Sequence, residues 1–260
     1  MENEFELFAF YSNIELLNEL VGAGIDGIII DWEKKGKANR QILFDTQVNK
    51  HTVSDLNAVR EHTSSRVICR INGQPFLDTD EINTAIELGA DELLVPMIKT
   101  LDEVEFVLEV VNGRADVGFM LETNEALQIA DQLNKFPIYR FFVGLNDLCI
   151  QRKLRNIFLP IIDGTIDELR PKLTKRFGMA GLTHPLSGEP VPCASLIKEM
   201  KRHKCSFGFL RRSFYRDLSR YSVQSIISAL REEFHQNFEL SVRNEKITLK
   251  EKEIFKNALI

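Results

Sequence analysis

The chain has few of the residues and segments that mark disulfide-rich, zinc-binding, secreted or membrane-spanning proteins. Its four cysteines are widely scattered and form no Cys-x-x-Cys pair, so we predict reduced thiols rather than a disulfide frame or a zinc site. The longest apolar runs have the length of a strand, which argues against a transmembrane helix. The first residues, Met-Glu-Asn-Glu, lack the basic start and apolar run of a secretion signal. We therefore expect a cytoplasmic protein without a membrane partner.

Basic charge is also scarce. The 33 lysines and arginines are outnumbered by 38 acidic residues, which gives a net charge of −5. Such a balance offers no general attraction to a nucleic-acid backbone, so we expect no nucleic-acid partner. The content of 44% hydrophobic and 27% charged residues is typical of a globular protein. A chain of 260 residues is long enough for one large domain with a substantial core.

Eight short apolar runs recur along the chain, separated by amphipathic stretches. Their residues are continuously apolar rather than alternating, as expected of parallel strands covered on both faces. The runs are 7–10, 27–30, 67–69, 93–95, 117–121, 141–143, 177–182 and 207–210. Eight β-then-α units predict an α/β fold, a (β/α)₈ TIM barrel. An open doubly wound sheet is the structural alternative, but it would need no eighth unit.

The amphipathic stretches have helical periodicity. Residues 101–111 carry one apolar stripe, and Thr100 with Glu103 forms a capping-box pattern ahead of it. A second stripe runs through 223–234. We assign residues 1–240 to the barrel domain and 241–260 to a C-terminal helical extension. Because the extension ends in apolar residues, we expect it to pack either on a neighbouring subunit or on the outer helices of the barrel.

Two acidic residues, Glu122 and Asp147, each follow an apolar run that leads into a helix. In a parallel barrel the ends of such strands share one mouth. At about 4 Å and an effective dielectric near 20, two bare carboxylates repel by roughly 4 kcal/mol. A shared proton or a divalent cation removes this repulsion, and hard oxygen donors favour Mg²⁺ or Mn²⁺. The alternatives are a helix-start acid for Glu122 and an N-cap for Asp147.

Further polar residues follow the other predicted strands, where the active sites of barrels are built. A surface or capping role is the alternative for each residue alone, but their occurrence at successive strand ends favours a common site. They are Asp31, Glu33, Arg70, Asn72, Lys99, His184, Arg211 and Arg212.

Four strand-end segments are Ile30-Asp-Trp-Glu33, Cys69-Arg-Ile-Asn-Gly73, Leu121-Glu-Thr123 and Val143-Gly-Leu-Asn-Asp-Leu148. In order and spacing they resemble the HpcH/HpaI aldolase and citrate lyase β-subunit family. This resemblance implies a (β/α)₈ barrel of the phosphoenolpyruvate- and pyruvate-binding superfamily. It also implies a divalent metal that helps to make or break carbon–carbon bonds next to a 2-keto acid or an acyl-CoA. Trimers or hexamers are the assemblies that it leads us to expect.

The resemblance also implies roles for individual residues. Glu122 and Asp147 would be the ligands of Mg²⁺ or Mn²⁺. Arg70, with Asn72 beside it, would bind the substrate carboxylate or the developing enolate oxygen, because a planar guanidinium suits a carboxylate. Asp31 and Glu33 are catalytic candidates that would orient metal-bound water or shape the loop.

The chain departs from the aldolase branch at two positions. Lys34 stands where that branch has an acid–base histidine, and Met120 stands where it has a glutamine. The general base is therefore unassigned. Two further hypotheses concern basic residues: Lys99 as a Schiff-base lysine, and Arg211 with Arg212 as the binding site of a phosphorylated or nucleotide-linked substrate.

We predict a divalent-metal-dependent carbon–carbon lyase or aldolase that acts on a 2-keto acid, with a pyruvate-like enolate partner. One alternative is a lyase acting on an acyl-CoA or a phosphoenolpyruvate-type substrate. Another is a non-catalytic ligand-binding barrel, which Lys34 and Met120 favour. The expected partners are a small-molecule substrate and further copies of the chain in a homo-oligomer.

Overall fold

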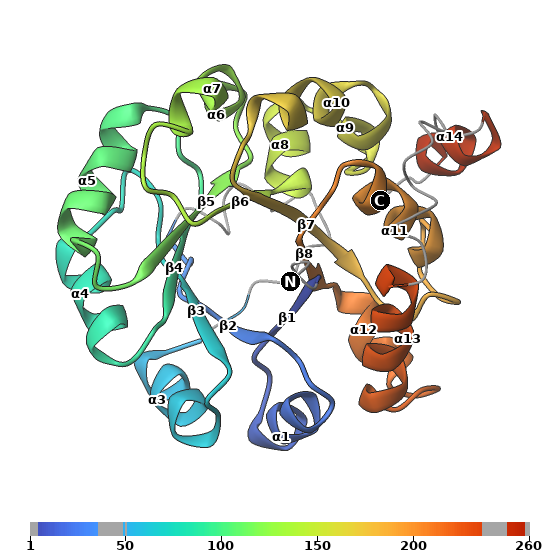
Figure 1. The fold of residues 1–260 in the computed structure, drawn as a ribbon, viewed down its shortest axis with the longest axis horizontal. Helices are drawn as coiled ribbons and strands as arrows, with labels where there is room; N and C mark the ends of the chain where they lie inside the picture. The colour runs from blue at the N-terminus through green and yellow to red at the C-terminus, as the bar shows by residue number, and fades with distance from the viewer. Residues whose placement is uncertain (1–4, 36–48, 50, 236–248, 258–260) are drawn as a thin grey trace.

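The structure, a computed structural model, describes residues 5–35, 49, 51–235 and 249–257. Eight parallel strands form a closed barrel in the order of the sequence, surrounded by helices (Figure 1). The first and last strands close the barrel by pairing in parallel, with Glu6 opposite Phe207. This closure confirms the predicted (β/α)₈ barrel over the open doubly wound sheet.

Each strand extends its predicted apolar run by no more than one residue at either end. The continuous apolar sequence explains this agreement, because the strands are covered inside and outside the barrel. The strands are β1 (Glu6–Phe10), β2 (Gly27–Asp31), β3 (Arg66–Arg70), β4 (Glu92–Val95), β5 (Asp116–Leu121), β6 (Arg140–Val143), β7 (Arg176–Leu182) and β8 (Phe207–Leu210).

The helices lie around the barrel (Figure 1). The predicted capping box is confirmed, since Glu103 N–H donates to Thr100 Oγ1 and Thr100 N–H donates to Glu103 Oε2, both at 3.3 Å. The helices are α1 (Ile14–Gly22), α3 (Val53–His62), α4 (Thr79–Glu87), α5 (Leu101–Val111), α6 (Asn124–Gln128), α7 (Ala130–Leu133), α8 (Leu145–Gln151), α9 (Leu159–Ile162), α10 (Thr165–Leu169), α11 (Cys193–Arg202), α12 (Arg212–Asp217), α13 (Val223–His235) and α14 (Leu249–Lys256), with a 3₁₀ helix η1 (Arg170–Lys172).

The interior of the barrel is filled by a column of aromatic and aliphatic side chains. Phe142 and Phe209 stack in it with ring centroids 4.2 Å apart. The buried members of the column are Phe8, Ile29, Ile68, Leu94, Met120, Phe142, Phe207 and Phe209. The barrel is therefore a packed core and not a pore, and only its ends can hold a site.

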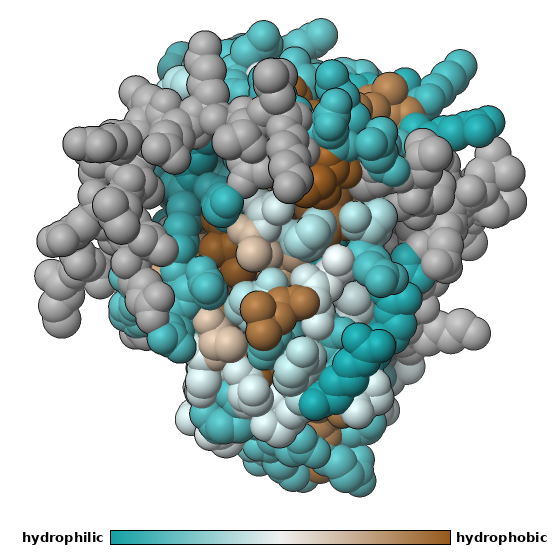
Figure 2. Space-filling model, turned by 90° about the vertical axis from the view of Figure 1, so that its right-hand side faces the viewer, coloured by the Kyte–Doolittle hydropathy of each residue, from teal (hydrophilic) through white to brown (hydrophobic). Residues whose placement is uncertain are grey.

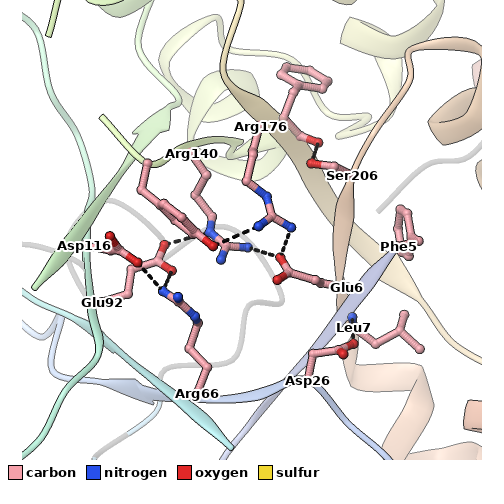
Figure 3. Close-up of polar contacts among 12 residues, drawn as sticks. Phe5, Glu6, Leu7, Asp26, Arg66, Glu92, Asp116, Arg140, Arg176 and Ser206 are labelled. Atoms are coloured by element: carbon pink, nitrogen blue, oxygen red, sulfur yellow. Dashed lines mark hydrogen bonds and ion pairs between the residues drawn. The ribbon is translucent and has the colours of Figure 1, made fainter. Parts of the chain in front are cut away.

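The N-terminal end of the barrel is closed by buried ion pairs (Figure 3). Glu92 lies 2.9 Å from Arg140 Nε and 3.1 Å from Arg66 NH1. The guanidinium of Arg140 also lies 4.7 Å from the ring centroid of Phe8 and 4.8 Å from that of Phe207. Burial raises the pKa of Glu92 to about 7, although Arg140 and Arg66 oppose the shift. The ion pairs of Glu92 and the packing of Arg140 on aromatic rings together close the N-terminal end of the barrel.

The C-terminal helix α14 packs on the barrel's own outer layer near α9. The ring of Phe255 is buried and meets Phe158 edge-on at 6.1 Å. Asn156 Nδ2 donates to the carbonyls of Phe255 and Lys256. Of the two expected contacts, the structure therefore contains the one with the barrel. The proposed domain boundary at residue 240 lies outside the described residues and stays a prediction.

No helix in the described ranges is both long enough and apolar enough to cross a bilayer. On the face that forms the right-hand side of Figure 1, apolar surface occurs as separate small patches within hydrophilic surface (Figure 2). The four cysteines are buried and free, as predicted.

Candidate active site

A cavity of about 260 Å³ opens at the carboxyl ends of the strands and brings together five of the residues singled out in the sequence. Its floor is the upper part of the aromatic column, with Phe10, Met120, Phe142 and Phe209. Its walls include five charged residues that stand at or after the ends of β3, β5, β6 and β8. These are Arg70, Glu122, Asp147, Arg211 and Arg212.

Glu122 follows β5 and is only 2% exposed. Its Oε1 accepts a hydrogen bond from the backbone N–H of Met97 at 2.9 Å. The carboxylate lies against Gly144, where an added Cβ would come within 2.0 Å of Oε2. Thr123, the next residue, caps α6 and donates to the carbonyl of Ile98. Glu122 is therefore held in a fixed place by a glycine cradle and a backbone donor.

Asp147 reaches the same cavity from the first turn of α8 and is 9% exposed. The N-cap of this helix is Gly144, so the N-cap alternative for Asp147 is wrong. Burial raises the pKa of Glu122 well above its usual value, and the charges of Asp147 and Glu33 raise it further. In the described part of the chain, no arginine or lysine forms an ion pair with Glu122. The Glu122 carboxyl group therefore lies in a desolvated place where its ionised form is disfavoured.

Arg70, the last residue of β3, is clamped by the acidic residues that follow β2. Its Nε and NH2 donate to Asp31 Oδ1 and Oδ2 at 2.8 and 2.7 Å, and Nε lies 3.5 Å from Glu33 Oε2. Burial lowers the pKa of Arg70, but the charges of Asp31 and Glu33 outweigh this effect and raise it above the ordinary value. NH1 lies 3.9 Å from Met120 Sδ in the cavity floor. Among the described residues, no carboxylate contacts this nitrogen.

Asn72 is not among the residues that line the cavity. Its Oδ1 accepts from the backbone N–H groups of Lys34 and Lys35 at 3.0 and 2.9 Å. Its Nδ2 donates to Glu81 Oε1 at 2.6 Å. Asn72 therefore joins the segment after β2 to the start of α4, and it shapes the rim from behind.

Two residues behind Asp31 were not anticipated from the sequence. Asn49 Nδ2 donates to Asp31 Oδ2 at 3.1 Å, and the backbone N–H of Asp31 donates to His51 Nδ1 at 2.9 Å. Burial lowers the pKa of His51 although Asp31 opposes the shift. Both residues lie in a polar stretch without strand or helix periodicity, so no local signal could have assigned them to the site. Their contacts with Asp31 exist only in the folded barrel.

The remaining basic candidates divide between the cavity and the surrounding rim. Arg211 and Arg212 line the cavity. His184 stacks on Tyr221 at 3.8 Å outside it, in keeping with a structural role. Lys99 does not line the cavity either; it is exposed, and its backbone N–H donates to Glu103.

Glu122 and Asp147 fit a divalent cation by their chemistry. Both are hard oxygen donors, they are buried, and a cation would offset the repulsion that burial strengthens. Within the described ranges, no three His, Cys, Asp or Glu side chains gather as a ligand set. A cation held by two carboxylates would therefore keep positions for water and for a bidentate substrate.

Several solved structures have a fold similar to that of this chain. The chain resembles an HpcH/HpaI aldolase structure from Desulfitobacterium hafniense DCB-2 (TM-score 0.60, 12% identity, 80% of this chain and 86% of that one). It also resembles an HpcH/HpaI aldolase/citrate lyase family protein from Burkholderia cenocepacia J2315 (TM-score 0.63, 14%, 84% and 92%). The chain has the fold of the HpcH/HpaI aldolase and citrate lyase family. A citrate lyase from Burkholderia xenovorans LB400 shares it (TM-score 0.58, 13%, 86% and 76%).

Sequence similarity is more limited. No protein-family profile matches the chain. Over 88 residues it is 36% identical to a 4-hydroxy-2-oxovalerate aldolase from Rhodococcus jostii (strain RHA1). That match covers 34% of this chain and 29% of the relative, so the chain spans less than a third of the length of that relative. The resemblance expected from the strand-end motifs is nevertheless confirmed by the fold of the structural neighbours.

Proposed function

We propose that the protein is a divalent-metal-dependent carbon–carbon lyase or aldolase that acts on a 2-keto acid. The observation that carries this proposal is the pair of buried carboxylates, Glu122 and Asp147, in one cavity with the guanidinium of Arg70. A buried acidic pair is costly for folding, and such costs cluster at functional sites. The aldolase and citrate lyase fold of the neighbouring structures supports the same class of reaction.

The residues divide the chemistry between them. Glu122 and Asp147 would hold Mg²⁺ or Mn²⁺, which as a Lewis acid stabilises the negative charge that develops on a keto oxygen. Arg70 would bind the substrate carboxylate through NH1, while Asp31 keeps its fork in place. The apolar floor excludes water and so strengthens these charge interactions.

Met120 changes the cavity where the aldolase branch has a glutamine. Its thioether is a weak acceptor and lies beside Arg70 NH1 at 3.9 Å. The floor next to the guanidinium is therefore apolar, and NH1 is left to a ligand.

The cheapest test is the exchange of the C3 protons of pyruvate in D₂O, followed by NMR with and without Mn²⁺. We expect exchange that depends on Mn²⁺ and is lost in Glu122→Gln. Gly144→Ala should also slow it, because the new Cβ displaces the Glu122 carboxylate without removing it. Exchange that survives complete chelation, together with trapping of Lys99 by borohydride, would replace the proposal with Schiff-base chemistry. Binding of Mn²⁺ and oxalate without exchange of any keto acid would favour the ligand-binding barrel.

We also infer that the protein acts in the cytoplasm on a small molecule and forms a trimer or hexamer. The resemblance of the strand-end motifs to the family supports the assembly. Sedimentation equilibrium of the full chain tests it, and a monomer at micromolar concentration would contradict it.

A further inference from the structure

A second arginine, Arg211, follows β8 and is among the residues that line the cavity. In the part of the chain that the structure describes, its only hydrogen bond is from NH2 to the carbonyl of Val191 at 3.0 Å. Its Nε is buried and has no partner there. Burial lowers the pKa of Arg211, and no carboxylate among the described residues forms an ion pair with it. Arg211 is therefore a desolvated cation in the wall of the cavity.

Arg70 and Arg211 line the same cavity but differ in how their charge is balanced. Arg70 has two nitrogens on Asp31 and one near Glu33. Among the described residues, the Arg211 guanidinium donates only to a backbone carbonyl, and the charges of Asp217 and Glu189 act on it without forming an ion pair. Removing a charge from water without an ionic partner costs several kcal/mol in general. A cation kept in this state at a cavity wall is most simply explained by an anion that arrives with a ligand.

The segment between β7 and α11 keeps the Arg211 side chain in place. Gly188 has φ +113°, and an added Cβ there would come within 2.0 Å of Arg211 NH2. Val191, which accepts the hydrogen bond, is fully buried. The guanidinium is thus packed into a site made for it, unlike the neighbouring Arg212, which is exposed.

We propose that Arg211 selects substrates with a second anionic group, a carboxylate or a phosphate, at the end distant from the 2-keto acid. This inference rests on the proposed function, in which Arg70 and the acidic pair take the keto-acid end. A cavity of about 260 Å³ lies below the roughly 300–1,000 Å³ of typical drug-sized ligand sites. A short dianionic acid therefore suits the cavity better than a bulky thioester.

The test compares two keto acids of equal chain length, 2-oxovalerate and 2-oxoglutarate, which differ by a terminal carboxylate. A third, with a terminal phosphonate, separates a carboxylate site from a phosphate site. Binding to the Mn²⁺-loaded full chain is measured by calorimetry for the wild type, Arg211→Gln and Arg211→Lys. The matched control is Arg216→Gln, because Arg216 is exposed on α12, the helix that begins directly after Arg211, and is not among the residues that line the cavity.

We expect the wild type to bind at least one dianionic acid more tightly than 2-oxovalerate. Arg211→Gln should weaken the binding of that acid about 10- to 100-fold, which is the effect of one charged hydrogen bond. The affinity for 2-oxovalerate should change less than about 3-fold. Arg211→Lys should lie between, and Arg216→Gln should match the wild type. Thermal unfolding of each variant verifies the fold.

Two outcomes would overturn the inference in different ways. The inference is wrong, and the proposed function stands, if the wild type exchanges pyruvate protons but has the same affinity for all three acids. The same holds if Arg211→Gln lowers the affinity for all three acids equally. A wild type that neither exchanges pyruvate nor binds any of the three acids removes the proposed function, and the inference falls with it.

Discussion

Two glutamates at opposite ends of the barrel, Glu92 and Glu122, are almost fully buried, yet their surroundings differ. Burial raises the pKa of both. At Glu92, Arg140 and Arg66 oppose the shift and hold the pKa at about 7. At Glu122, the charge of Asp147 adds to the shift and Arg70 opposes it only in part. The charge of Glu92 is therefore balanced by arginines of the chain, whereas a proton or a bound cation would remove the repulsion at Glu122.

The difference separates a structural end of the barrel from a functional one. Arg140, which pairs with Glu92, lies over the rings of Phe8 and Phe207 in the aromatic column, so the ion pairs of Glu92 close the barrel. Glu122 lines a cavity instead. In (β/α)₈ barrels the N-terminal face serves stability and the C-terminal face serves chemistry. We therefore expect the same residue type to serve stability at one end of the barrel and chemistry at the other.

The largest expected effect is on turnover after removal of an acidic ligand. Asp147→Asn and Glu122→Gln should each lower kcat/KM at least about 10³-fold, because a metal stabilises an enolate-like charge by several kcal/mol. Glu92→Gln, the matched change at the other end, should leave kcat/KM within about 3-fold. Steady-state assays with saturating Mn²⁺ measure this. Equal losses at both ends would mean that the two glutamates do not differ in role.

The clamp on Arg70 predicts the next effect. Arg70→Lys keeps the charge but cannot make both contacts with Asp31, so we expect kcat/KM to fall about 100-fold with the fold retained. Circular dichroism and steady-state kinetics together test this expectation. Unchanged kcat/KM would show that the bidentate hydrogen bond with Asp31 does not position the guanidinium for catalysis.

A smaller effect concerns how Glu92, at the N-terminal end of the barrel, makes the free energy of unfolding depend on pH. The pKa of Glu92 is about 7 in the folded protein and about 4.5 when unfolded, so the folded state binds more protons between these values. Its contribution to stability is complete below about pH 4.5 and is lost as pH rises through about 7. The loss amounts to about 3 kcal/mol. Urea unfolding of the wild type and Glu92→Gln should show this difference between the two proteins; parallel curves would contradict the assignment.

The smallest effect tests whether every residue at the C-terminal end of the barrel, where the cavity lies, matters for activity. Thr100→Ala removes the capping box of α5, which lies at the open end but not among the residues that line the cavity. We expect a loss of about 1 kcal/mol in unfolding free energy and no change in kcat/KM. A drop in kcat/KM beyond about 3-fold would extend the functional region past the cavity.

The fold followed from the sequence because its signals are local. Each strand contains a continuous apolar run, and amphipathic stretches with helical periodicity separate the runs. Glu122, Asp147 and Arg70 could be picked out for the same reason, since strand ends in a barrel converge. A charged residue also begins β3, β4 and β6, at Arg66, Glu92 and Arg140. These three residues were not singled out in the sequence, because charge at a strand start does not show which partner it meets across the barrel; the ion pairs became visible only in the fold.

Other parts of the site depend on contacts between distant segments. Asn49 and His51 reach Asp31 from a stretch without periodicity, so only the folded barrel brings them together. Gly144 belongs to a recognised motif, but its function as the cradle of Glu122 depends on the packing of β6 beside β5. Asn72 has a suitable place in the sequence, yet its side chain turns to the backbone behind the rim. Such side-chain directions cannot be read from spacing alone.

The most direct measurement is the affinity for Mn²⁺ of the wild type and of the two Glu→Gln variants, by calorimetry at constant pH. We predict one site per chain in the wild type and in Glu92→Gln, and at least about 100-fold weaker binding in Glu122→Gln, because a carboxylate ligand is lost. Without Mn²⁺, Glu122→Gln should unfold at a higher temperature than the wild type, since a buried and repelled charge is removed. Unchanged affinity in Glu122→Gln would contradict the proposal that the open end of the barrel is a metal site.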